Sequence, residues 1–136
     1  NALEGKKRPA HTLMPVMLRR DGRLTGVHGA MGGKAQPQIH AQLVLRLLGG
    51  ATPGDTLAAP RWVAGGLDVD SDDDVILLER SAGPAVADAF GAAGMPVELL
   101  DDMDEGVGHA QLIRIGLDGT LEAATDPRAD GAAAAG

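Results

Sequence analysis

The sequence lacks cysteine and tyrosine entirely, and its 136 residues include one tryptophan and one phenylalanine. Without cysteine, a disulfide framework, a thiolate metal site and a cysteine nucleophile are all excluded, although the cellular compartment is not identified. With Trp62 and Phe90 as the only aromatic side chains, the core must be built from Leu, Val, Ile, Met and Ala. Little aromatic surface is left for stacking on nucleic-acid bases or for interface hot spots.

Positive charge is also scarce, with 12 Lys and Arg against 19 Asp and Glu and a net charge of −7. This balance argues against nucleic acid or an anionic membrane surface as a partner. No apolar run approaches the roughly 20 residues that a membrane-spanning helix needs. We therefore expect no nucleic-acid partner and no membrane span. The compartment stays open between the bacterial cytoplasm and, if a missing N-terminus carries a signal, the periplasm or the exterior.

The pattern of apolar residues and turn signals predicts one mixed α/β (α+β) domain with hairpins and about three helices. Two hairpins are expected around the turn dipeptides Asp21-Gly22 and Asp118-Gly119. We expect residues 1–2 to be the remnant of an affinity tag, residues 3–130 to form the folded part, and residues 131–136 to be a flexible tail. The predicted strands are 14–20, 24–29, 75–78, 97–100, 111–115 and 120–124, and the predicted helices are 36–48, 53–58 and 84–93.

The acidic segment from Asp68 to Glu79 superficially matches a calcium loop, with Asp at the first, third and fifth positions and Glu at the twelfth. The sixth position of such a loop requires Gly for a sharp turn, and here it is Asp73. The flanking helices are also missing, because a strand is predicted directly afterwards. We expect a solvated acidic loop and no metal site.

The most informative segment runs from Gly29 to His40, where a turn containing Gly32 and Gly33 leads into an amphipathic helix. Two glycines allow close approach of another group, and their amides near a helix N-terminus can point at a negative charge. Such amides form the oxyanion hole of acyl-transfer enzymes. The alternative is a turn that needs glycine for its geometry alone. A phosphate loop is excluded, since His28 and Ala35 stand where its first Gly and its Ser or Thr belong.

Four further segments occur in a fixed order around this turn: 5–15 (GKKRPAHTLMP), 59–62 (APRW), 108–111 (GHAQ) and 124–131 (ATDPRADG). Together with the glycine turn they resemble the C-terminal part of the small subunit of gamma-glutamyltransferases, from about residue 5 to residue 136. These enzymes are N-terminal-nucleophile amidohydrolases. The resemblance implies that the chain forms part of an αββα sandwich.

The resemblance also implies roles for four residues. The residues that match Gly32 and Gly33 donate their amides to the tetrahedral oxyanion. Where the family carries a Ser-Ser pair that holds the α-carboxylate of the glutamyl group, this chain has His11 and Thr12. Thr12 keeps a hydroxyl and His11 can donate a hydrogen bond, so both are predicted to bind substrate. This departure leaves room for another acyl group, as in the related cephalosporin acylases.

The resemblance places the nucleophile outside the chain, because these enzymes use a Thr at a newly exposed N-terminus whose α-amine is the general base. The expected partners are the remainder of the parent enzyme, comprising the large subunit and the start of the small subunit, and a small γ-glutamyl substrate. No cofactor is implied, and the chain alone is expected to be inactive. The rival hypothesis is a non-catalytic assembly module that pairs with a partner chain or with a second copy of itself.

The remaining polar residues are predicted to be structural. Residues 126–128 and 60–62 are expected to be structural, with a nearby Arg anchoring the turn that starts at Asp126 through bidentate hydrogen bonds. Gln38, His40 and Gln42 are expected to face solvent or an interface. No pair of histidines has a metal-ligand spacing.

Overall fold

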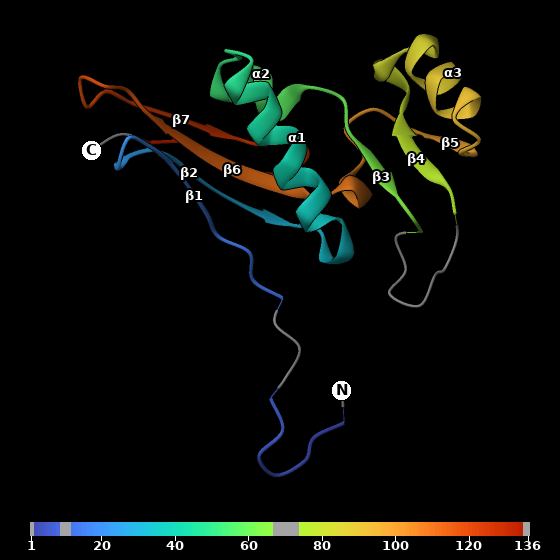
Figure 1. Ribbon diagram of the computed structural model, residues 1–136, viewed down its shortest axis with the longest axis horizontal. Helices are drawn as coiled ribbons and strands as arrows, with labels where there is room; N and C mark the ends of the chain where they lie inside the picture. Colours follow the sequence, from blue (N-terminus) through green and yellow to red (C-terminus); the bar gives the residue numbers. More distant parts are fainter. Residues whose placement is uncertain (1, 9–11, 67–73, 135–136) are drawn as a thin grey trace.

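The computed structural model describes residues 2–8, 12–66 and 74–134, which form two sheets and three α-helices (Figure 1). The mixed α+β class predicted from the sequence is confirmed. None of the helices in these ranges has the length and apolar character that a membrane crossing requires. In chain order the elements are β1 (Val16–Arg20), β2 (Arg23–Met31), α1 (Gln36–Leu48), α2 (Pro53–Ala58), β3 (Trp62–Ala64), β4 (Ile76–Glu79), α3 (Pro84–Ala92), β5 (Val97–Leu100), β6 (His109–Ile115) and β7 (Leu121–Thr125).

The first sheet is antiparallel and has the strand order β1-β2-β6-β7. Its outer pairs are the two hairpins that the turn dipeptides predicted. Asp21 and Gly22 have φ angles of 51° and 79°, as the hairpin turn with two left-handed residues requires. The central pair β2–β6 aligns His28 with Leu112 and joins the two halves of the chain.

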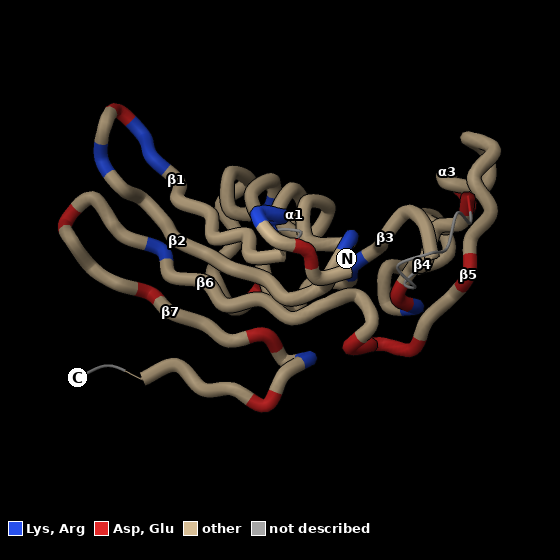
Figure 2. The backbone as a smooth tube through the Cα atoms, turned by 90° about the horizontal axis from the view of Figure 1, so that it is seen from below, with Lys and Arg blue, Asp and Glu red and all other residues tan. Residues whose placement is uncertain are grey.

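Helices α1 and α2 cover one face of this sheet and form the main core with it (Figure 1). Ile39, Leu43 and Leu57 from the helices and Leu112 from β6 are at most 1% exposed. The opposite face carries exposed apolar side chains, including those of Met17, Met31 and Ile113. Figure 2, in which this sheet lies in front of α1, shows no helix of the described part over that face.

The second sheet has the order β3-β4-β5, with β4 and β5 parallel and connected through α3. The sequence predicted β4, α3 and β5. Because residues 75–78 are apolar on both faces, they also suggested a strand that the rest of the parent covers and through which the chain alone would self-associate. Ile76, Leu77 and Leu78 are instead buried within the described residues, so β4 offers no such surface. Strand β3 was not predicted. It has three residues, pairs antiparallel with β4, and is too short for an alternating pattern to be visible in the sequence.

The side chains of Gln38 and Gln42 pack against β3 and that of His40 packs against β2, which corrects the expectation that these three residues face solvent or an interface. Gln42 and His40 are buried, and Gln38 is half-buried. The Gln42 amide donates to the Trp62 carbonyl at 2.8 Å and accepts from the Trp62 N–H at 3.3 Å. Gln38 makes the same pair of bonds with Ala64, at 3.0 and 2.7 Å. The periodicity of α1 identified its apolar face, but polar side chains with backbone partners in a short strand leave no such signal.

A buried network of four charges joins β3, β4 and the end of β7. The side chains of Arg61, Asp126, Arg128 and Glu79 form two ion pairs, Arg61 with Asp126 and Arg128 with Glu79, and all four are fully buried. A third contact of 3.1 Å joins Arg128 to Asp126. Two positive and two negative charges balance, so that no net charge is buried. The Asp126 turn is thus anchored by Arg, as predicted, but by two arginines with one contact each and not by one bidentate pair.

The first half of the acidic segment from Asp68 to Glu79, residues 68–73, lies outside the described residues, which resume at Asp74. The last residue of the segment, Glu79, is at the end of β4 and belongs to the buried charge network. Among the described residues no group of three or more His, Asp or Glu side chains is arranged to hold a metal ion. Residues 131–134 of the predicted tail are exposed and have no regular secondary structure.

Candidate active site

The turn between β2 and α1 leaves its backbone open at Gly33 and packs it against the core at Gly32. Gly33 has a φ of 50°, and a Cβ atom added there would meet no atom within 4 Å. Gly32 is packed instead, because an added Cβ would lie 2.8 Å from Cδ1 of the fully buried Ile39. Within the described residues neither amide donates a hydrogen bond, whereas the Gly32 carbonyl accepts from the Ala35 N–H at 2.8 Å. Gly32 therefore fixes the turn on the core and Gly33 presents it outward.

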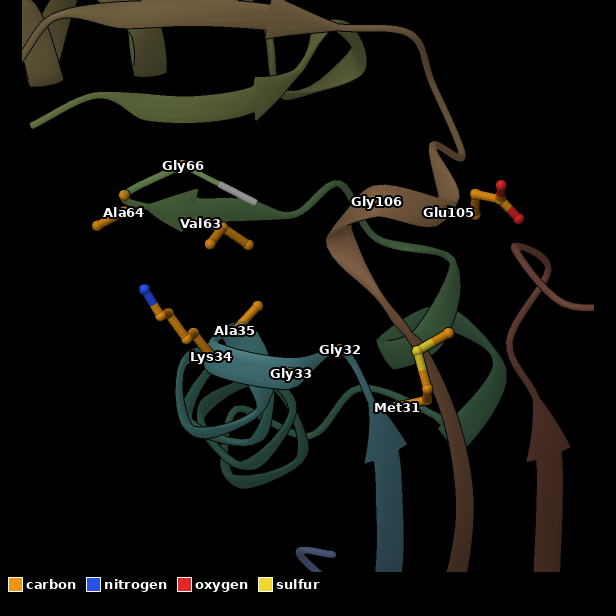
Figure 3. A pocket seen from close by; sticks show the side chains of 11 residues that line it. Met31, Gly32, Gly33, Lys34, Ala35, Val63, Ala64, Gly66, Glu105 and Gly106 are labelled. Atoms are coloured by element: carbon orange, nitrogen blue, oxygen red, sulfur yellow. The ribbon is translucent and has the colours of Figure 1, made fainter. Parts of the chain in front are cut away.

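A pocket of about 470 Å³ lies directly against this turn (Figure 3). Gly32, Gly33 and Lys34 form one wall, and the end of β3 at Val63 and Ala64 faces them across the pocket. Among the other lining residues, Gly65 and Gly66 continue the second wall, and Glu105 and Gly106 stand at one end. The glycine turn predicted as an oxyanion site thus borders a pocket large enough for a small acyl group.

The structure also connects Thr12 to this turn. The buried side chain of Gln36, in the first turn of α1, donates from Nε2 to the Thr12 carbonyl at 2.9 Å. Thr12 is itself exposed, and within the described residues its hydroxyl has no hydrogen-bond partner. His11, the other predicted substrate-binding residue, lies outside the described residues. Two segments that are distant in the sequence, the one at Thr12 and the one at Gly33, therefore meet at the start of α1.

A buried histidine pair, which sequence reasoning did not identify, lies between β2 and α1. Nδ1 of His28 and Nδ1 of His40 are 2.8 Å apart, so one nitrogen donates to the other. Both residues are at most 5% exposed. Burial and the neighbouring His40 lower the pKa of His28 from 6.5 to about 4. Burial also lowers the pKa of His40, while the Met14 backbone opposes that shift. The pair is therefore neutral near pH 7.

The buried charge network holds the segment that packs beneath the glycine turn. Arg61 donates from Nη1 to the Gly108 carbonyl at 2.7 Å. A Cβ atom added at Gly108 would lie 2.3 Å from the Met31 carbonyl oxygen and 3.3 Å from the Gly32 Cα. Only glycine therefore fits at Gly108, and the turn rests directly on the backbone that Arg61 anchors.

Solved structures that share this fold are N-terminal-nucleophile hydrolases. A cephalosporin acylase from Bacillus halodurans superimposes with a TM-score of 0.81 at 30% sequence identity, covering 96% of this chain and 24% of that chain. The gamma-glutamyltranspeptidase of Pseudomonas nitroreducens superimposes with a TM-score of 0.78 at 27% identity, covering 99% of this chain and 67% of that chain. The two sheets and three helices therefore form part of the fold of that class of enzyme.

The sequence comparisons define the family. The profile described as Gamma-glutamyltranspeptidase matches residues 1–136, and the chain therefore belongs to the gamma-glutamyltranspeptidase family. An oxamate amidohydrolase proenzyme from Klebsiella pneumoniae is 43% identical over 135 residues, and a glutathione hydrolase-like proenzyme from Bacillus subtilis is 34% identical over 134 residues. Each alignment covers 98% of this chain and 25% of the relative, so the chain spans about a quarter of the length of these curated relatives.

Proposed function

We propose that this chain is the C-terminal part of an autoprocessed amidohydrolase that transfers an acyl group from an amide to water or an amine. One observation carries the proposal: the Gly32-Gly33 turn borders a pocket, and its amides have no partner within the described residues. Membership of the family and the similarity to two proenzymes support it.

The proposed reaction proceeds through a threonyl ester formed by a Thr outside this chain. Attack on the amide carbon makes a tetrahedral intermediate whose oxygen carries negative charge. The Gly32 and Gly33 N–H groups would donate hydrogen bonds to that oxygen as the charge develops. Collapse of the intermediate expels the amine, and water or a second amine then releases the acyl group. Because the nucleophile lies in another segment, we expect this chain alone to be inactive.

The substrate we propose is an amide whose acyl group carries a carboxylate. The Thr12 hydroxyl would donate a hydrogen bond to that carboxylate. Thr12 is exposed, and its carbonyl is joined through Gln36 to the start of α1. The predicted γ-glutamyl group has such a carboxylate, and so does the oxalyl group of the substrate that names the relative with 43% identity. The similarity to this amidohydrolase favours a short acyl group such as oxalyl as a second candidate beside γ-glutamyl.

The partner we propose for the fold is the remainder of the same enzyme. The face of the first sheet with Met17, Met31 and Ile113 is apolar and exposed, and a second sheet layer would cover it. The rival hypothesis, an assembly module without catalysis, predicts the same open face. The two hypotheses differ in whether a processed, full-length protein has amidase activity.

The test uses the full-length enzyme that contains this chain, purified after autoprocessing. Its release of amine or ammonia is measured from γ-glutamyl anilide, from oxamate and from an anilide whose acyl group lacks a carboxylate. The proposal expects cleavage of at least one carboxylate-bearing amide at a rate well above that of the uncharged one. A processed protein that cleaves none of the three would support the assembly module.

A further inference from the structure

Gln36 stands between the two halves of the proposed site. It is the first residue of α1, three positions after Gly33, and its side chain is 6% exposed. Its Nε2 donates to the Thr12 carbonyl at 2.9 Å, across 24 residues of sequence. Among the hydrogen bonds of the described residues, this is the one that ties Thr12 to the rest of the fold.

The Gln36 bond holds Thr12 itself, and two residues later the Met14 backbone bonds to His40 of the same helix. Residues 12–15 have no regular secondary structure and are exposed, and β1 begins at Val16. The backbone of such a segment is free to move unless a partner holds it. Gln36, by contrast, is fixed, because α1 is anchored in the core by Ile39 and Leu43.

We infer that Gln36 is a positioning residue that holds the Thr12 hydroxyl at a set place relative to the Gly32-Gly33 turn. This inference rests on the proposed function. A carboxylate on the acyl group and the carbonyl that is attacked lie at a fixed separation in the substrate. Gln36 sets the matching separation in the protein. Its backbone follows the glycine turn at the start of α1, and its side-chain amide donates to the Thr12 carbonyl. It thereby selects amides whose acyl group carries a carboxylate.

The consequence is a selective loss of activity. Without the Gln36 bond the Thr12 hydroxyl samples several positions, so binding of the carboxylate weakens while the oxyanion turn is unchanged. One neutral hydrogen bond contributes about 0.5 to 1.5 kcal/mol, which corresponds to a roughly 2- to 12-fold rise in KM for the carboxylate-bearing substrate. The rate constant kcat and the cleavage of an uncharged amide change little.

The experiment measures kcat and KM of the full-length, autoprocessed enzyme with a carboxylate-bearing and an uncharged anilide. Gln36→Met keeps the length and helix propensity of the side chain but removes the donor. Thr12→Val removes the hydroxyl, and the double variant completes a cycle. Gln42→Met is the matched control. It removes a buried amide from the same helix, and that amide bonds to the Trp62 backbone of β3 and not to Thr12.

The inference expects Gln36→Met and Thr12→Val each to raise KM for the carboxylate-bearing substrate alone, with no further rise in the double variant. Gln42→Met should leave the ratio of kcat/KM between the two substrates unchanged. Additive effects, or equal losses on both substrates, would overturn the inference while leaving the proposed function intact. If wild type cleaves neither anilide and does not cleave oxamate, the proposed function itself is wrong. Should Gln36→Met fail to process, Gln36→Asn, which is one methylene shorter, gives the same comparison.

Discussion

The buried pair of His28 and His40 predicts that acid destabilises the fold. A bond between two Nδ1 atoms needs one nitrogen with a proton and one without, so protonation of both rings at Nδ1 breaks it. The pKa of His28 falls from 6.5 to about 4 on folding. The unfolded chain therefore binds a proton more readily than the folded one. The stability that the neutral ring contributes is present above pH 6.5 and is lost as the pH falls toward 4.

The size of the effect follows from the two pKa values. At pH 5 a His with a pKa of 6.5 is almost fully protonated in the unfolded chain, while one with a pKa of about 4 stays mostly neutral in the folded chain. The linkage relation then gives a loss of about 2 kcal/mol between pH 7.5 and pH 5 from His28 alone. The lowered pKa of His40 acts in the same direction.

Urea unfolding of wild type and of His28→Leu at pH 7.5 and pH 5 measures this loss of stability. The variant is expected to be about 1 to 3 kcal/mol less stable near pH 7.5, because it leaves Nδ1 of His40 buried without a partner. It should also lose about 2 kcal/mol less than wild type on acidification. Titrating groups other than His40, which contacts His28, affect both proteins equally and cancel in the difference. Equal losses for the two proteins would refute the reasoning.

Four further predictions follow from the site and the packing. The chain alone should hydrolyse no γ-glutamyl anilide, whereas the autoprocessed full-length enzyme should; turnover by the chain above a blank would contradict the view that it holds only part of the site. Gly33→Val in the full-length enzyme should lower kcat by roughly 100- to 1000-fold with little change in KM, because a β-branched residue is strained at a φ of 50° and would tilt the amide; a processed variant with near-normal kcat would show that the glycines only form a turn. Arg128→Met should destabilise the fold by about 3 to 5 kcal/mol in urea, since it leaves Glu79 and Asp126 buried with too little positive charge; a loss below about 1 kcal/mol would mean that water reaches these carboxylates. The isolated chain should self-associate through the open face of the first sheet, and light scattering over a concentration series that shows only monomer would argue against this.

Much of the fold could be predicted because its signals are local. Turn dipeptides such as Asp21-Gly22 require left-handed backbone, and the spacing of Ile39, Leu43 and Leu47 fits one face of a helix. Each of these patterns depends on neighbours within a few residues, so a single sequence is enough to interpret it. The prediction that a nearby Arg anchors Asp126 depended on the complementary chemistry of a turn-forming Asp and an Arg, and it did not identify which arginine makes the contact.

The features that sequence reasoning missed depend on residues that are distant in the chain. His28 and His40 are twelve residues apart on different elements, and nothing in their local sequence indicates that they meet. Glu79 looked like the end of an acidic loop, because the buried Arg128 that neutralises it lies 49 residues away. The glycine turn was found from its two glycines ahead of a helix, and Thr12 was found through the family resemblance. The role of Gln36 between them became visible only when the two segments were placed side by side.

Two of the three glutamines of α1, Gln38 and Gln42, give β3 the equivalent of a neighbouring strand. Four residues of helix rise about 6 Å and two residues of strand advance about 6.6 Å, so the amides of Gln38 and Gln42 meet the backbone at Ala64 and Trp62 in step. A strand from another molecule finds no free N–H or carbonyl to pair with at those two residues, which protects this edge of the second sheet against cross-strand aggregation. Apolar replacements at both glutamines would preserve the helix and yet expose that edge. Any association of the isolated chain must therefore use a different surface, and variants that lose both amides should be the ones that precipitate.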